Sequence, residues 1–213
     1  MKAPRLLWAL LLTGAAGVVL AVPMAQRELD LVMTRNPDVQ RGAEIYATCA
    51  GCHGPDGEGA SDGSVPVLAG QSYLVIAKQI VDFRTGVRSD SRMEHFTDGR
   101  HLAFSQPIAD VSMYIAGLPR PEARVAPADV SVAQGKVLYD RLCARCHYGL
   151  GQGNEDTLAP RLASQHSEYL FAQLSAAATG SRSTLIQSHT ALVKGLSEAE
   201  LKSIAGYLST LSP

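Results

Sequence analysis

One short motif occurs twice and uses every cysteine of the chain. Cys-x-x-Cys-His stands at residues 49–53 and again at residues 143–147. This spacing is the attachment signature of c-type haem, in which both thiols form thioethers with the ring and the histidine supplies an axial nitrogen to the iron. A zinc site or a redox-active thiol pair is the alternative, but neither explains a histidine directly after each pair. The sequence therefore predicts two covalently bound haem c groups, attached through Cys49, Cys52, Cys143 and Cys146, with His53 and His147 as iron ligands.

The two motifs belong to a repeat with a constant offset. Cys49 and Cys143 lie 94 residues apart, and no insertion is needed from there to Leu102 and its partner Leu196. The same offset relates Pro66 to Pro160, Gln71 to Gln165, Gly86 to Gly180, Arg88 to Arg182 and His95 to His189. Such self-similarity indicates two copies of one domain.

The apolar pattern predicts helices as the elements that position these residues. Apolar residues recur at helical spacing before each motif and over residues 71–84 and 105–116. Asn36-Pro37 is expected to cap the first helix, and Ser197 and Glu200 form a capping-box pattern before the last. Residues 86–100 are expected to form a polar loop. No stretch alternates at period two for long, so the sequence predicts an all-α chain.

Composition and the positions of the prolines predict the domain boundaries. With 213 residues and a net charge of −1, the chain is long enough for two small domains and unlike a nucleic-acid-binding protein. The expected segments are a signal peptide or membrane anchor at 1–25, a stalk at 26–35, a first domain at 36–119, a linker at 120–128 and a second domain at 129–213. Two prolines and little apolar pattern mark the linker.

The N-terminal segment predicts a location. Lys2 and Arg5 precede an apolar run over residues 6–22, which places the following chain on the outer side of the membrane. The run suits either a signal peptide cut after Ala21 or a retained anchor. We therefore expect a periplasmic protein, either soluble after cleavage or anchored to the outer face of the inner membrane.

At the level of motifs, residues 36–212 resemble the two-domain, diheme class I cytochromes c of the c-four type. The resemblance rests on both haem motifs, on Pro-x-Leu-Ala-x-Gln at 66–71 and 160–165, on residues 82–88, and on the terminal helix. It implies two cytochrome c folds related by a pseudo-twofold axis, with facing haem edges. It also implies that the carbonyls of Pro66 and Pro160 accept the proximal histidine N–H. Arg88 and Arg182 are expected either to neutralise haem propionates or to be solvated.

The sixth iron ligand departs from the family pattern. The family places a methionine seven residues before the leucine that opens the last helix, and here both copies have histidine, His95 and His189. No methionine follows Met113, so His189 is the predicted ligand of haem two. For haem one we expect His95, with Met93 as the alternative. Two bis-histidine haems would have low potentials and no vacant iron site.

These features predict an electron carrier and not an enzyme. No nucleophile–base pair or phosphate loop is visible, and no catalytic residue is assigned. Expected partners are redox proteins: a dehydrogenase, a quinol-oxidising complex or a terminal oxidase. The alternative is a haem enzyme, a sulfur-compound oxidoreductase or a peroxidase, with one open or exchangeable axial position.

Overall fold

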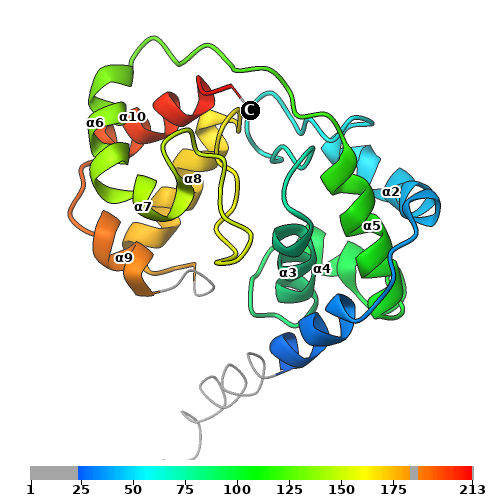
Figure 1. The fold of residues 1–213 in the computed structure, drawn as a ribbon. Coiled ribbons are helices and arrows are strands. Elements are labelled where there is room, and N and C mark those ends of the chain that lie inside the picture. Colours follow the sequence, from blue (N-terminus) through cyan, green and yellow to red (C-terminus); the bar gives the residue numbers. More distant parts are fainter. Residues whose placement is uncertain (1–23, 183–186, 213) are drawn as a thin grey trace, which may run out of the picture.

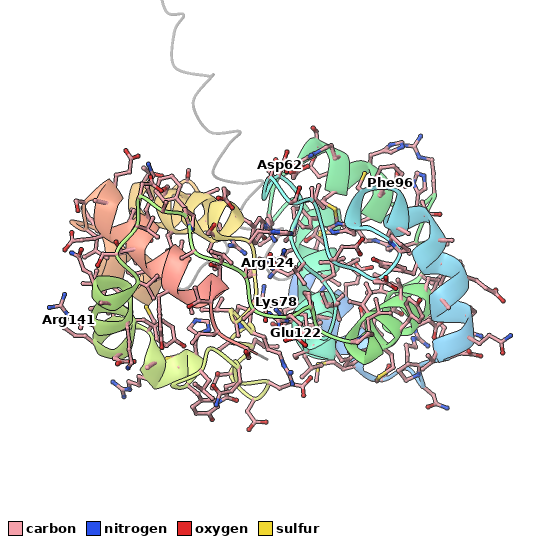
Figure 2. All side chains as sticks on the ribbon, turned by 90° about the horizontal axis from the view of Figure 1, so that it is seen from above. Asp62, Lys78, Phe96, Glu122, Arg124 and Arg141 are labelled. Carbon is pink, nitrogen blue, oxygen red and sulfur yellow. The ribbon has the colours of Figure 1, made fainter. Side chains whose placement is uncertain are left out.

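A computed structural model describes residues 24–182 and 187–212 of the protein. It consists of two helical lobes that lie side by side, joined by a linker that crosses from one to the other (Figure 1; Figure 2). Within the described residues the extended pairing is limited to one isolated bridge between Asn154 and Ala159. The predicted all-α class, built from two tandem domains, is therefore confirmed.

The first lobe contains four helices besides the N-terminal one. They are α2 (Val39–His53), α3 (Tyr73–Arg84), α4 (Ser91–Thr97) and α5 (Ser105–Gly117). Helix α2 packs across α5. The crossing is close because Gly42 faces the backbone of Asp110, where a Cβ atom would collide with the carbonyl. This crossing brings the haem motif, at the end of α2, against the core of the lobe.

The second lobe repeats this arrangement. Its helices are α6 (Val132–Leu142), α7 (Ala144–His147), α8 (Ser167–Thr179), α9 (Gln187–Val193) and α10 (Glu198–Ser209). Helix α6 crosses α10 as α2 crosses α5, and Gly135 meets the backbone of Ser203 at the crossing. The α2 equivalent is interrupted at Cys143, so the second haem motif occupies the short helix α7.

A tyrosine pair joins each helix crossing to the haem motif. The rings of Tyr46 and Tyr114 lie 5.3 Å apart, and those of Tyr139 and Tyr207 lie 5.6 Å apart. The Tyr46 hydroxyl donates a 2.8 Å hydrogen bond to the carbonyl of Gly54, the residue after His53. The Tyr139 hydroxyl donates to Tyr148, the residue after His147, at 2.6 Å. Each buried tyrosine thus fixes the end of a haem motif.

Helix boundaries follow the capping chemistry and differ from expectation in two places. Helix α2 begins after Asp38, whose carboxylate accepts the Arg41 N–H, and not after Asn36-Pro37. The expected loop at 86–100 contains α4, because the Asp90 side chain caps it by accepting two backbone N–H groups. The capping box of Ser197 and Glu200 is confirmed.

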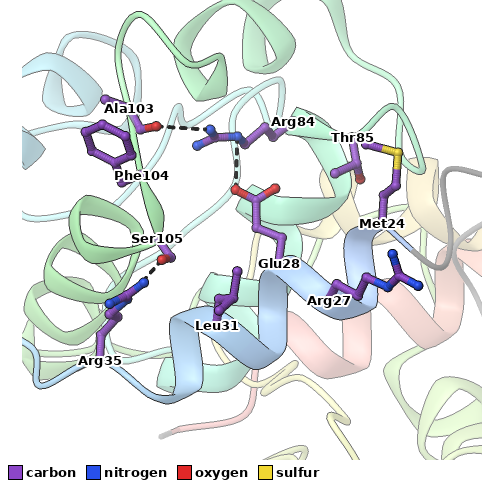
Figure 3. Close-up of a pocket in the computed structure, with 10 residues that line it drawn as sticks. All are labelled: Met24, Arg27, Glu28, Leu31, Arg35, Arg84, Thr85, Ala103, Phe104 and Ser105. Atoms are coloured by element: carbon purple, nitrogen blue, oxygen red, sulfur yellow. Dashed lines mark hydrogen bonds and ion pairs between the residues drawn. The ribbon is translucent and has the colours of Figure 1, made fainter.

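Residues 26–35 differ from the expected stalk. Residues 24–33 form a helix whose apolar face belongs to the core of the first lobe: Leu29 is 5% exposed and Val32 fully buried. Glu28 pairs with Arg84 of α3 at 3.1 Å, beside an open groove of about 510 Å³ (Figure 3). The helix is therefore part of the domain. None of the helices within the described residues is long and apolar enough to span a bilayer; the apolar run over residues 6–22 lies outside them.

The linker at 120–128 is held by both lobes. The Arg120 guanidinium donates to the carbonyl of Ala69 and, 94 residues further along the chain, to that of Ala163. Burial lowers the pKa of Arg120 to about 10. Arg124 adds a bond from its backbone N–H to the Ser209 carbonyl at 2.8 Å. Arg120 therefore ties the start of the linker to equivalent residues of the two lobes.

Candidate haem sites

The two motif histidines occupy equivalent, buried positions. His53 and His147 are each 6% exposed. Their Nδ1 atoms bond to the carbonyls of Pro66, at 3.2 Å, and Pro160, at 2.9 Å. Burial lowers the pKa of both rings, which favours the neutral form that binds a metal. With Nδ1 engaged, Nε2 is the free ligand atom, and the prediction that these two prolines accept the bond agrees with the geometry.

A glycine in each loop allows this proline carbonyl to approach. Gly59 and Gly153 have positive φ angles of 72° and 75°. A Cβ at Gly59 would collide with the Val65–Pro66 backbone, and one at Gly153 with the Ala159–Pro160 backbone. Each glycine also donates its N–H to the carbonyl of the motif histidine. Only glycine meets both requirements without strain.

The two cysteines of each motif differ in exposure. In each motif the first cysteine is partly buried and the second exposed. Burial raises the pKa of the Cys49 and Cys143 thiols to about 11, so they stay protonated at neutral pH. No cluster of three or more His, Cys, Asp or Glu side chains suited to a metal occurs within residues 24–182 and 187–212. Neither finding supports the zinc or the redox-thiol alternative.

In the second lobe the predicted distal histidine faces the proximal one. The ring centroids of His147 and His189 lie 6.0 Å apart with 68° between their planes. A metal–imidazole bond of about 2 Å on each side, plus half of each ring, accounts for a separation of this size. The Nδ1 atom of His189 is buried and has no hydrogen-bond partner within the described residues. These side chains fit a haem iron held between two imidazoles.

The equivalent histidine of the first lobe lies elsewhere. His95 is exposed, and its ring contacts His101 at 4.8 Å and Phe96 at 5.0 Å. Met93, two residues earlier on α4, is partly buried. Its neighbour Arg92 is close enough to His53 to help lower that pKa, after burial. The two copies therefore differ at this position, although the sequence places a histidine in both.

Arg88 and Arg182 meet at the interface between the lobes. Each donates to the glutamine of its own lobe and to that of the other, since both guanidinium groups share the side chains of Gln79 and Gln173. Arg88 also donates to the Tyr169 hydroxyl at 3.0 Å. Burial, and then Arg88, lower the pKa of Arg182 to about 10. We call these four residues and Tyr169 the arginine cluster.

The arginine cluster has excess positive charge. One carboxylate that interacts with both guanidinium groups is that of Asp82, which is 2% exposed and already paired with Lys78 at 2.5 Å. Burial raises the pKa of Asp82, although Lys78 and both arginines act in the opposite direction. The Nε atom of Arg182 is buried without a partner within the described residues. Two partly buried guanidinium groups with neutral partners and one vacant donor suit a carboxylate ligand such as a haem propionate.

Sequence reasoning missed the glutamines that join the lobes near the proximal loops. Gln165 bonds to both backbone groups of Val67, and Gln71 bonds to both backbone groups of Arg161. The matched Gln71–Gln165 pair in the repeat was the available signal. His166, the residue after Gln165, is 3% exposed, and its Nε2 bonds to the Glu58 carbonyl across the interface at 2.9 Å.

Comparisons with known proteins agree with this geometry. The family model for cytochrome c matches residues 39–118 and 132–212. Cytochrome c4 from Azotobacter vinelandii is 28% identical over 191 residues, covering 82% of this chain and 89% of the relative. A thiosulfate dehydrogenase electron acceptor from Stutzerimonas stutzeri is 29% identical over 214 residues, covering 94% of each chain.

A solved structure is similar over both lobes. The reduced recombinant cytochrome c4 from Pseudomonas stutzeri superposes with a TM-score of 0.72 at 25% identity, covering 83% of this chain and all of the other. The repeated motif, the paired proximal sites and these matches lead to one conclusion. The chain belongs to the cytochrome c family, as a protein of two class I domains that each carry one covalently attached haem c.

Proposed function

We propose that this diheme electron-transfer cytochrome passes single electrons from a dehydrogenase to a respiratory acceptor on the outer side of the membrane. Haem supplies one-electron exchange when bound, and the protein sets its potential and exposure. The observation that supports a carrier most directly is the distal side of the second site. Because the His189 ring lies 6.0 Å from the His147 ring, the two histidines would hold the second iron together and leave it no position for a substrate.

We infer that the two sites have different distal ligands. His189 is proposed for haem two, so that this haem is bis-histidine. For haem one the exposed His95 is the weaker candidate and the partly buried Met93 the stronger, because an iron ligand must point into the domain. Thioether sulfur favours ferrous iron, whereas a second imidazole favours ferric iron. Haem one would then have the higher potential, and an electron would rest on the first domain.

The arginine cluster is proposed to bind propionates. Arg88 and Arg182 together present donors that glutamine oxygens satisfy only in part. Carboxylates at this position would neutralise the charge of the two guanidinium groups, whose planar geometry suits them. Since both arginines contact both lobes, the cluster would hold the propionate edges of the two sites toward each other.

The proposed donor and location follow from the relatives and the N-terminus. One relative is named as the electron acceptor of thiosulfate dehydrogenase, so a dehydrogenase of this kind is the first donor to test. The basic, then apolar, N-terminal sequence supports export, with the protein either released or anchored in the periplasm. Mass spectrometry of the purified chain separates these two: a mature N-terminus near Val22 excludes the anchor.

Ligand variants test the proposed function. Low-temperature EPR and visible spectra of the oxidised protein should give two low-spin haems, one with a methionine–iron charge-transfer band. Met93→Ala should remove that band and His189→Ala should make only haem two high-spin, while His95→Ala changes neither. A native high-spin haem that binds cyanide or sulfite would refute the carrier and favour the haem enzyme. Loss of a low-spin signal in His95→Ala alone would restore His95 as the ligand.

A further inference from the structure

Two glutamines reach across the interface in a reciprocal way. The Gln165 amide accepts the Val67 N–H at 2.9 Å and donates to the Val67 carbonyl at 3.0 Å. Gln71 makes the same pair of bonds, at 2.9 and 3.0 Å, to the backbone of Arg161. Both glutamines are buried, at 5% and 7% exposed. Each side chain therefore satisfies both backbone groups of one residue in the other lobe.

The residues they hold are adjacent to the groups that orient the haem ligands. Val67 follows Pro66, whose carbonyl accepts the His53 Nδ1–H, and Arg161 follows Pro160, whose carbonyl accepts that of His147. A peptide bond joins each clamped residue to the carbonyl in question, and peptide units are rigid planes. The clamp in one lobe therefore fixes the carbonyl that orients the proximal ring in the other.

Other bonds hold each segment before the proline and beyond the clamped residue. Before the proline, the Ala60 N–H donates to the Val65 carbonyl, and Ala159 pairs with Asn154. The N–H groups of Leu68 and Ala69 bond to Gly57, and those of Leu162 and Ala163 bond to Gly151. Arg120 donates to Ala69 and Ala163. Within the peptide that carries the proline carbonyl, the N–H group belongs to the clamped residue and donates to the glutamine, so the orientation of this peptide depends on the glutamine.

We propose that Gln165 is a positioning residue for the proximal ligand of haem one, and Gln71 for that of haem two. A hydrogen bond to Nδ1–H increases the donor strength of the imidazole and favours ferric iron. Each lobe thereby tunes the potential of the haem in the opposite lobe. The inference rests on haem attachment through the two motifs and not on the distal ligands or the partners proposed above.

Isosteric variants test this crossed dependence in the intact diheme protein. Gln165→Met removes both bonds to Val67, and Gln71→Met removes both bonds to Arg161. The first readout is NMR of the two proximal Nδ1 protons in the reduced protein, which are assigned to individual histidines. In Gln165→Met the His53 proton should exchange about tenfold faster, as the loss of one hydrogen bond implies, while that of His147 is unchanged. Gln71→Met should give the reverse.

The second readout is the potential of each haem, by spectroelectrochemical titration. The midpoint potential of one haem should rise in each variant: that of haem one in Gln165→Met, and that of haem two in Gln71→Met. The control is Glu155→Ala, which removes a bond between the lobes, from the Ser72 hydroxyl at 2.9 Å, but none of the glutamine bonds to Val67 and Arg161. It should move neither potential nor exchange rate.

Several results would overturn the inference. The first is a change of potential and exchange rate at the haem in the same lobe as the substituted glutamine. The second is no change at either haem. The third is the same change in Glu155→Ala. If a methionine variant does not fold, Gln165→Asn and Gln71→Asn keep the amide but shorten its reach, and are judged by the same crossed pattern. A failure of the carrier proposal would appear as a high-spin haem in the wild-type protein and would leave the exchange pattern readable.

Discussion

Replacing Leu29 by alanine tests whether the N-terminal helix belongs to the first domain. Leu29 is 5% exposed in the core of that lobe. The change removes three carbon atoms, worth about 0.8 kcal/mol each, and leaves a cavity that adds to the cost. Because the helix lies at the edge of the lobe and can partly close the gap, we expect a loss of about 2.5 kcal/mol. In native-state hydrogen exchange, amides of residues 24–35 should lose protection by roughly 70-fold.

Leu31 provides a matched control on the same helix. It is 52% exposed, so Leu31→Ala has the same effect on helix propensity but removes little buried surface. Its protection factors should stay within about twofold of wild type. Equal, small effects in both variants would refute the docked helix and restore the stalk as the description of residues 26–35. Mass-spectrometric detection of peptides from this segment gives the comparison directly.

Three further outcomes follow from the packing. Burial lowers the pKa of His166, so the unfolded chain takes up a proton near pH 6.5 that the folded protein does not. The free energy of unfolding should therefore fall as the pH drops below about 6.5. His166→Gln should reduce this pH dependence, measured by urea titrations at several pH values. Equal slopes would contradict the interface role. Gly135→Ala forces α6 away from α10 and should lower the free energy of unfolding by about 3 kcal/mol, measured from the denaturant midpoint. The control Gly117→Ala should cause no loss, because its Cβ meets nothing within 4 Å. Tyr139→Phe removes one of the two bonds to the Tyr148 carbonyl, which also accepts the Gly151 N–H, and should cost about 1 kcal/mol with an unchanged m-value; a neutral result would mean that water replaces the hydroxyl.

Local and repeated features were predictable from the sequence. The motif spacing identified both proximal histidines, the offset of 94 identified the duplication, and Ser197 identified the start of α10. Capping at Asp90 was visible too, but α4 is too short to give a periodic signal. In the N-terminal segment Ala25, Leu29 and Val32 do show helical spacing, which a reading centred on the apolar run at 6–22 overlooked.

Contacts between the lobes were not predictable in the same way. A repeat shows that Gln71 and Gln165 are equivalent, but not that each bonds to the other copy. Similarly, the matched positions of His95 and His189 suggested equal roles. The structure separates them, because His95 lies on α4 with its ring against His101, whereas His189 faces His147. Equivalent positions in a repeat indicate that the two copies share a fold. They do not determine which residues surround each side chain.

The arginine cluster shows that the duplicated halves are no longer interchangeable. Arg88 matches Arg182, and Gln79 matches Gln173, but the Lys78–Asp82 pair has only alanines at the equivalent positions of the second lobe. Two second lobes facing each other would bring two partly buried Arg182 side chains together without the Asp82 carboxylate that the native pairing supplies, which is costly. The molecule is in this sense a covalent heterodimer, in which each half is matched to the other and pairing between like halves of separate molecules is disfavoured.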